Sequence, residues 1–266
     1  MNPLKNKVVW VTGASSGIGE ALCYQLAEKG AKLVLSSRNT AVLNAVKQNC
    51  KADPKDILVL PLDLENIKNA DGLANIITDY FGRIDILVNN GGISQRALFV
   101  DTSPTVFRKI MEINFFGGVE LTRAVVPIMS RQKAGHIVAI SSVTGKFGTP
   151  LRSAYAASKH AMHGFYDALR AELYHDKIKV LLVAPGYVKT KISYNALLGD
   201  GSANNELDPG QANGISTEEC ANATIKAIEE GKYEIYPGKL KEVGAVYIKR
   251  FFPSMLRDLV RKVNVR

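Results

Sequence analysis

Tyr155 and Lys159 are the pair of side chains in this sequence best suited to proton transfer, and Ser142 lies thirteen residues before Tyr155. If Tyr155 is on a helix, Lys159 falls one turn further along the same face. The pKa of a free tyrosine is about 10, which makes it a poor acid or base at neutral pH. A neighbouring ammonium group favours the phenolate and lowers that pKa toward the working range. The three residues therefore predict acid–base chemistry on a carbonyl or an alcohol, with the Ser142 hydroxyl orienting its oxygen.

A glycine-rich segment near the start of the chain has the context of a dinucleotide-binding turn. It follows the apolar run 7–11, a predicted buried strand, and opens a helical pattern that carries Leu22 and Leu26 and ends at Gly30. Outside that context the glycines would mark only an ordinary turn. Here they permit a tight turn, close approach of the backbone to a pyrophosphate and packing of helix on strand, while the helix N-terminus favours phosphate. The predicted cofactor contacts in this segment are Gly13, Ser15, Ser16, Gly17, Ile18 and Gly19.

The end of the second predicted strand, residues 32–36, bears on the type of nucleotide. NAD-selective sites place an acidic residue here for the ribose 2′-hydroxyl, whereas this chain has Ser37 followed by Arg38. A guanidinium suits a 2′-phosphate, so NADP(H) is expected rather than NAD(H). The alternative is an arginine that is merely solvated at a strand end. Asp63, after the run 57–62, is expected either to contact the adenine or to be the N-cap of the next helix.

Together these motifs resemble those of the short-chain dehydrogenase/reductase family, over about residues 5–238. The matching patterns are TGxxxGIG at residues 12–19 and YxxxK at residues 155–159. The segment 137–142 is similar to the family's fifth strand and catalytic serine, and the spacing from the tyrosine favours Ser142 over Ser141.

Two further segments match the family's cofactor loops. Residues 89–92 resemble its NNAG motif but carry Gly91 where alanine is usual, a mild change that could loosen the loop. Residues 185–190 resemble the PGxxxT loop that embraces the nicotinamide. The cofactor contacts that the resemblance implies here are Asn90, Gly91, Pro185, Gly186, Val188 and Thr190.

The resemblance also implies roles for four residues. Tyr155 would be the acid/base, and Lys159 would lower its pKa and bind the nicotinamide ribose, so that both also count as cofactor contacts. Ser142 would hold the substrate oxygen, and Asn114 would hold a water linked to the lysine and complete a proton relay. The positive charge of the oxidised cofactor would further favour the phenolate. Taken singly, each residue has a plain structural interpretation, such as a turn cap for Ser142 or a helix cap for Asn114.

Length and element order predict the fold. At 266 residues the chain is expected to form one domain, and 46% apolar residues are enough for a large core. Strands alternate with helices at short spacings, which predicts a doubly wound Rossmann fold: a parallel sheet, seven-stranded by the resemblance, with helices on both faces. The polar segment 1–7 does not resemble a signal peptide, and no apolar run approaches the roughly 20 residues of a membrane span. A cytoplasmic, not secreted, protein is therefore expected.

Cysteine and histidine residues indicate neither disulfides nor a metal site. The three cysteines, Cys23, Cys50 and Cys220, are far apart and odd in number, which favours reduced thiols. His160 and His163 have a spacing that metals use, but no matching cluster accompanies them. They are expected at a helix surface or an interface, and no metal is expected.

The segment 239–266 is unusually basic. It holds eight Lys or Arg residues, Arg266 among them, and two acids, a net charge of +6 out of +9 for the chain. A helix is expected to start at Pro253, with an apolar stripe at Met255, Leu256, Leu259, Val260 and Val263. The stripe could pack on the domain or on a second subunit. Alternatively it could lie on a membrane surface, attracted by anionic lipid. Nucleic-acid binding is not expected, because no recognition motif accompanies the charge.

The predicted partners follow from the pocket segments. Residues 94–99, 143–150 and a lid at 190–214 are expected to line the substrate site, with Phe147 among its apolar residues. A hydrophobic ketone, aldehyde or alcohol is therefore expected, and the chain is most like family members that act on steroids, retinoids and similar lipids. A homodimer or homotetramer is expected. The alternative function is a cofactor-binding regulatory or scaffold protein of the same fold, membrane-associated through its tail.

Overall fold

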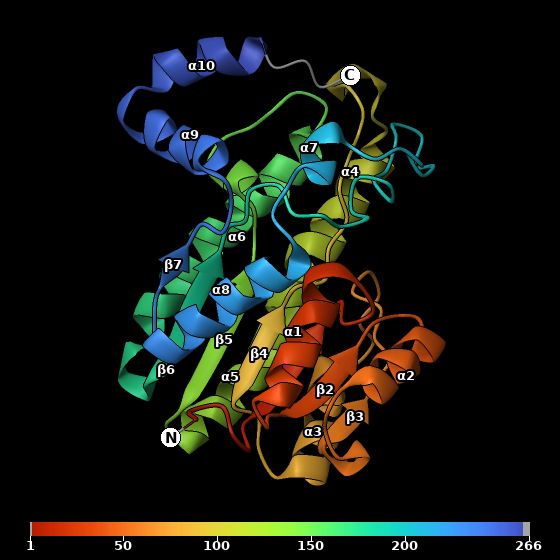
Figure 1. Cartoon of the computed structure of the whole chain (residues 1–266), viewed down its shortest axis with the longest axis vertical. Helices are drawn as coiled ribbons and strands as arrows, with labels where there is room; N and C mark the ends of the chain where they lie inside the picture. Colours follow the sequence, from red (N-terminus) through yellow and green to blue (C-terminus); the bar gives the residue numbers. More distant parts are fainter. Residues whose placement is uncertain (1, 263–266) are drawn as a thin grey trace.

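The computed structural model describes residues 2–262 and has a single parallel sheet at its centre (Figure 1). The seven strands are in the order β3-β2-β1-β4-β5-β6-β7, and every pairing between neighbours is parallel. This confirms the predicted fold class. Val263 and Arg266 of the predicted tail lie outside the described residues.

Where the sequence patterns gave the bounds of an element, the observed element lies close to them. The strands are β1 (Val8–Thr12), β2 (Lys32–Ser36), β3 (Ile57–Val59), β4 (Ile86–Asn89), β5 (Gly135–Ile140), β6 (Ile178–Val183) and β7 (Glu234–Ile235). The helices are α1 (Gly17–Glu28), α2 (Thr40–Asn49), α3 (Ala70–Phe81), α4 (Pro104–Met111), α5 (Gly117–Gln132), α6 (Ser153–Glu172), α7 (Pro209–Ala212), α8 (Thr217–Glu230), α9 (Leu240–Phe251) and α10 (Pro253–Arg261). As predicted, β2 spans residues 32–36 and α10 begins at Pro253.

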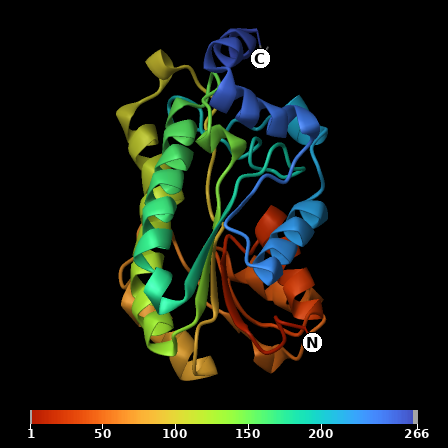
Figure 2. The same cartoon turned by 90° about the vertical axis from the view of Figure 1, so that its left-hand side faces the viewer.

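Helices cover both faces of the sheet, and Figure 2 shows the sheet between the two layers. On one face α1, α2 and α8 pack on side chains such as Val9 and Val11, which alternate along β1 with residues of the opposite face. On the other face α3, α5 and α6 pack on Val8 and Trp10. Most residues of the sheet are apolar because helices bury both faces of the sheet, as is usual for parallel sheets.

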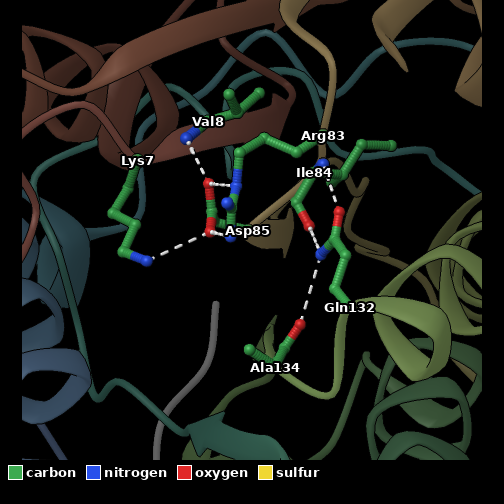
Figure 3. Close-up of polar contacts among 7 residues, drawn as sticks. All are labelled: Lys7, Val8, Arg83, Ile84, Asp85, Gln132 and Ala134. Atoms are coloured by element: carbon green, nitrogen blue, oxygen red, sulfur yellow. Dashed lines mark hydrogen bonds and ion pairs between the residues drawn. The ribbon is translucent and has the colours of Figure 1, made fainter.

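A buried carboxylate ties together the amino ends of β1 and β4 (Figure 3). The Asp85 carboxylate accepts hydrogen bonds from the backbone N–H of Val8 at 2.9 Å and from Arg83 Nη2 at 2.6 Å, and it pairs with Lys7 Nζ at 3.2 Å. Beside it, Gln132 Nε2 donates to the carbonyl of Ile84 at 2.8 Å. Because the sheet is parallel, this cluster is at the edge opposite the carboxyl ends of the strands. It fixes the register of β1 against β4 and leaves the other edge free for a site.

The strand order reverses between β1 and β4, since successive strands run outward from β1 to β3 and then from β4 to β7. In open parallel sheets such a switch point forms a crevice at the carboxyl ends of the strands, where ligands bind. Among residues 2–262, no helix is both long and apolar enough to cross a bilayer.

Candidate active site and cofactor cleft

A cleft of about 650 Å³ runs along the carboxyl ends of the central strands. It brings together the glycine turn after β1, the loops after β4 and β5, the start of α6 and the loop after β6. The predicted site residues that line it are Gly13, Ser15, Ser16, Gly17, Ile18, Arg38, Asp63, Asn90, Gly91, Ser142, Tyr155, Lys159, Pro185, Gly186, Val188 and Thr190. Gly19 and Asn114 lie behind its wall.

The glycine turn fits a dinucleotide pyrophosphate. Gly13 and Gly17 have positive φ angles of 64° and 62°, which side chains other than glycine rarely adopt. Gly19 faces Gly13 so closely that a Cβ would come within 2.3 Å of the Gly13 carbonyl oxygen. Ser16, the N-cap of α1, makes no side-chain capping bond, so the first N–H groups of the helix stay available to an anion.

The loop after β4 explains why this chain has Gly91. A Cβ on Gly91 would lie 2.4 Å from a methyl carbon of Leu64, so the glycine makes room for that leucine. The neighbouring Asn90 is held by Thr12: its Nδ2 donates to the Thr12 carbonyl at 2.9 Å, and its N–H donates to Thr12 Oγ1 at 3.0 Å. The loop is thus fixed against β1 by hydrogen bonds despite the glycine.

The end of β2 presents Ser37, Arg38 and Asp63 to the cleft. Arg38 is exposed, and the Ser37 hydroxyl is buried without a hydrogen-bond partner among residues 2–262. Asp63 accepts a bond from the backbone N–H of Glu65 at 3.0 Å. The next helix has Asn69 as its N-cap, so the alternative role of Asp63 as that cap is wrong. It caps a turn at the cleft wall.

Tyr155 and Ser142 meet at the inner end of the cleft. Ser142 is the N-cap of a short 3-10 turn, Val143–Gly145, and its Oγ accepts from the N–H of Thr144 at 3.2 Å. Its hydroxyl lies close enough to the Tyr155 hydroxyl to influence the pKa of that tyrosine. Burial raises the pKa of Tyr155, while the nearby Arg152 guanidinium and the Ser142 hydroxyl lower it. The side chain of Ser141 is directed instead to the carbonyl of Lys159 at 3.4 Å. Of the two serines, Ser142 is therefore the one beside the tyrosine.

Lys159 is on the same face of α6, one turn after Tyr155. Its Nζ lies 5.7 Å from the centre of the Tyr155 ring and donates to the carbonyl of Ile140 at 2.9 Å. Burial lowers the pKa of Lys159 to about 8. Lys159 was expected to lower the pKa of Tyr155. Instead, burial raises this pKa, and the groups that lower it are Arg152 and Ser142.

Asn114 occupies a π-helical turn, Glu112–Phe116, between α4 and α5. Such turns are frequent at functional sites. Its side chain bridges both backbone groups of Ile93, at 2.8 and 2.9 Å, and donates to Ser158 Oγ at 3.0 Å. A Cβ on Gly92 would lie 3.1 Å from Asn114 Oδ1 and 3.7 Å from Lys159 Nζ. The glycine thus keeps open a small space between the amide oxygen and the ammonium group.

Two of the three predicted substrate segments do not line the cleft. Ser94 and Gln95 are buried, and Gln95 Oε1 accepts from the N–H of Ala154 at 2.8 Å, which fixes the start of α6. Phe147 packs against Val246 of α9. Ser94, Gln95 and Phe147 thus belong to the scaffold behind the site, whereas Leu98 and Phe99 are exposed outside the cleft. The lid contributes Thr190, Lys191, Ile192, Asn195, Leu197, Ala203 and Gln211, and sequence reasoning missed Lys109 and Ile113 on the opposite wall.

A charge cluster that the sequence patterns did not reveal ties the lid to the start of α6. Asp208, the N-cap of α7, accepts hydrogen bonds from both Arg96 and Arg152. Asp208 and Arg152 are buried, and Arg96 is partly buried. The Arg152 guanidinium also lies 5.7 Å from the centre of the Tyr187 ring. One carboxylate faces two guanidinium groups, so the cluster keeps a positive charge close to Tyr155.

His163 is buried on α6, which corrects the expected surface position; His160 is exposed as expected. His163 Nδ1 lies 3.3 Å from Glu234 Oε1, and the same oxygen pairs with Lys146 Nζ at 2.8 Å. Burial alone would raise the pKa of Glu234, but the neighbouring His163, Lys146 and Tyr236 side chains lower it to about 2. The carboxylate thus joins α6, β7 and the loop that follows Ser142.

We expect Glu234→Gln to lower stability at neutral pH and to matter less as the solution is acidified. In the folded chain the pKa of Glu234 is about 2, below its ordinary value of 4.5, so its contribution is present above about pH 4.5 and lost as the pH falls toward 2. Urea unfolding of both proteins from pH 7 down to pH 3 measures the gap. A gap that stays constant over this range would contradict the assignment.

Comparison with known proteins places this geometry in a family. A family model described as short chain dehydrogenase matches residues 7–198. An Anopheles gambiae protein, "Dehydrogenase/reductase SDR family protein 7-like", is 41% identical over 97% of this chain and 83% of its own length. The human "Dehydrogenase/reductase SDR family member 7" is 41% identical over 98% of this chain and 78% of its own length.

Two solved structures share the fold. A short chain dehydrogenase from Burkholderia cenocepacia, in complex with NADP, has a TM-score of 0.80 at 24% identity and covers 97% of this chain and 98% of its own. A short chain dehydrogenase/reductase from Burkholderia phymatum, in complex with NAD, has a TM-score of 0.82 at 23% identity and covers 100% and 98%.

Proposed function

This chain belongs to the short-chain dehydrogenase family, and from that premise we propose that it is an NADP(H)-dependent oxidoreductase that interconverts a hydrophobic carbonyl compound and its alcohol. The observation that carries the proposal is the meeting of the Tyr155 and Ser142 hydroxyls, with Lys159 one turn away, at the inner end of the cleft. Tyr155 is proposed as the acid/base, Ser142 as the group that holds the substrate oxygen, and Lys159 and Asn114 as the relay behind them.

The proton chemistry follows from these positions. When bound, NADP(H) supplies or accepts a hydride at the nicotinamide. In the reducing direction Tyr155 donates its proton to the carbonyl oxygen, while Ser142 donates a hydrogen bond to the same oxygen. The resulting phenolate is stabilised by the positive charge of Arg152 and regains a proton through Lys159. The space beside Gly92, between Asn114 and Lys159, suits a water that passes this proton from solvent.

The cofactor would be held by the glycine turn, the loops after β4 and β6, and the end of β2. The exposed Arg38 and the unpartnered Ser37 hydroxyl support a 2′-phosphate and thus NADP(H), since both donate hydrogen bonds and no acidic residue follows β2. Because cells keep NADPH reduced, we infer that the enzyme mainly reduces carbonyl compounds.

We expect Arg38→Asp to reverse the cofactor preference. Loss of a charged hydrogen bond costs about 1.5–3 kcal/mol, or roughly 10- to 150-fold in the Kd of NADPH. The new carboxylate should bind the ribose 2′-hydroxyl of NADH. Nicotinamide fluorescence measures both affinities. The matched control is Arg131→Asp, which makes the same charge change at an exposed position near the C-terminal end of α5. Unchanged affinities in Arg38→Asp would show that this residue does not contact the phosphate.

The substrate is inferred to be hydrophobic because four large apolar side chains line the same cleft as Tyr155. Ile93 and Ile113 are on one wall, and Ile192 and Leu197 are on the lid. Their apolar surface favours a ketone or aldehyde with a sizeable hydrocarbon part.

We also infer that the chain works as one domain and assembles as a homodimer or homotetramer. Members of the family are generally oligomeric, and one continuous sheet joins β1 to β7. Light scattering of the full chain measures the assembly directly.

A further inference from the structure

Helices α9 and α10 form an arm that has two different faces. The inner face packs on the domain: Val246 and Leu256 are buried against Val143 and Phe147, in the loop directly after Ser142. Both helices are at the top of the molecule in Figures 1 and 2, with α10 at its outer margin. The packing alternative for the tail therefore accounts for one side of the arm only.

The outer face of the arm is apolar. Leu240 is 87% exposed, and Phe251 and Phe252 are 68% and 64% exposed. Leu240, Tyr247 and Phe251 are separated by seven and four residues, so they share one stripe along α9. Phe252 follows in the turn between the two helices. A contiguous surface of large apolar side chains on a folded protein marks an interaction site.

Basic residues border this stripe. On α9, Lys241 and Arg250 are about a quarter of a turn to either side of it by helical periodicity. Exposed basic residues are Lys239, Lys241, Lys249, Arg250, Arg257, Arg261 and Lys262. Residues 239–262 contain these seven basic residues and two acidic ones, so the arm has a net charge of +5. An apolar stripe flanked by cationic residues is the pattern of helices that lie in the interface of an anionic bilayer.

We propose that the outer face of α9 and α10 docks on an anionic phospholipid surface, with Phe251 and Phe252 in the acyl boundary and the basic residues at the headgroups. Charge complementarity distinguishes this occupant from a second copy of the chain, because two such arms would bring like charges of +5 together. A nucleic-acid duplex would satisfy the charges but leave the aromatic rings in water.

Docking in this way has a consequence for the active site. The inner face of the arm rests on the loop that follows Ser142, so the lipid surface would lie on the side of the molecule that carries the proposed catalytic serine. This consequence rests on the proposed function, whereas the docking itself does not.

The test uses the full chain and sedimentation with phosphatidylcholine vesicles that contain or lack phosphatidylserine. We expect binding to the phosphatidylserine vesicles, weakened by salt, and little binding to pure phosphatidylcholine. Lys241→Glu with Arg250→Glu, and separately Phe251→Ser with Phe252→Ser, should each raise the lipid concentration for half-maximal binding by at least about tenfold. The matched controls, Arg131→Glu with Lys226→Glu and Tyr174→Ser, change exposed residues outside the arm and should bind like the parent.

Each variant counts as folded if its Tm in thermal unfolding equals that of the parent protein. Absence of binding to phosphatidylserine vesicles by the parent would overturn the proposal. The proposal would also be overturned if Phe251→Ser with Phe252→Ser bound vesicles normally but lost its oligomeric state in light scattering. The outer face would then be a contact between subunits. Binding is also measured with Tyr155→Phe: an inactive chain that still binds vesicles separates failure of the proposed chemistry from failure of the docking surface.

Discussion

Tyr155→Phe is expected to lower kcat/KM by about 10²- to 10⁴-fold, the usual contribution of a positioned acid or base. The substitution removes one hydroxyl from a buried ring and leaves its shape intact, so the cleft should keep its form. NADPH binding, measured by nicotinamide fluorescence, should stay within a few-fold of the parent. Turnover is followed as loss of NADPH absorbance.

The control for this variant is Tyr174→Phe, which removes the same hydroxyl from a ring that is 75% exposed. It should leave turnover unchanged. If Tyr155→Phe retained the parent rate, another group would have to donate the proton, and the assignment of Tyr155 would be wrong. If it lost NADPH binding as well as turnover, the hydroxyl would have a role in the cofactor site instead.

Asp208→Asn is expected to destabilise the fold by about 3–5 kcal/mol, the range for removing one partner from a buried ion pair. The loss corresponds to roughly 6–20 °C in Tm for a chain of this size. The buried Arg152 and partly buried Arg96 guanidinium groups would then face each other without a carboxylate between them. Burial and Arg152 already lower the pKa of Arg96. Thermal unfolding at constant pH measures the effect.

Arg96→Met is the informative comparison, because it leaves Asp208 and Arg152 as a matched pair. Its Tm should fall by much less than that of Asp208→Asn. Glu28→Gln, which removes an exposed partner of Lys51, should have no measurable effect. If Arg96→Met were as damaging as Asp208→Asn, packing rather than charge balance would explain the cluster.

The strands, the helices and the glycine turn could be predicted because they depend on local patterns. The apolar run before Gly13 indicates a buried strand, and the glycine spacing indicates the turn that follows it. Once parallel strands are assumed, their carboxyl ends meet at one edge, so Ser142 and Tyr155 could be expected together although they lie on different elements.

The contacts that depend on packing between distant segments could not be predicted in this way. Asp208 meets Arg96 and Arg152 from positions 112 and 56 residues away, and no local pattern links them. The burial of His163 depends on β7, and the exclusion of Phe147 from the cleft depends on α9. The pKa of Tyr155 differs from the expectation because burial, which a sequence does not show, opposes the neighbouring charges.

The most direct test of the proposed reaction uses NADPH that carries deuterium at nicotinamide C4, incubated with a panel of hydrophobic ketones and aldehydes. We predict deuterium on the carbinol carbon of at least one product alcohol with the parent protein, and none with Tyr155→Phe. Tight NADPH binding without label in any product would contradict the account and would favour a cofactor-binding regulatory protein with the same fold.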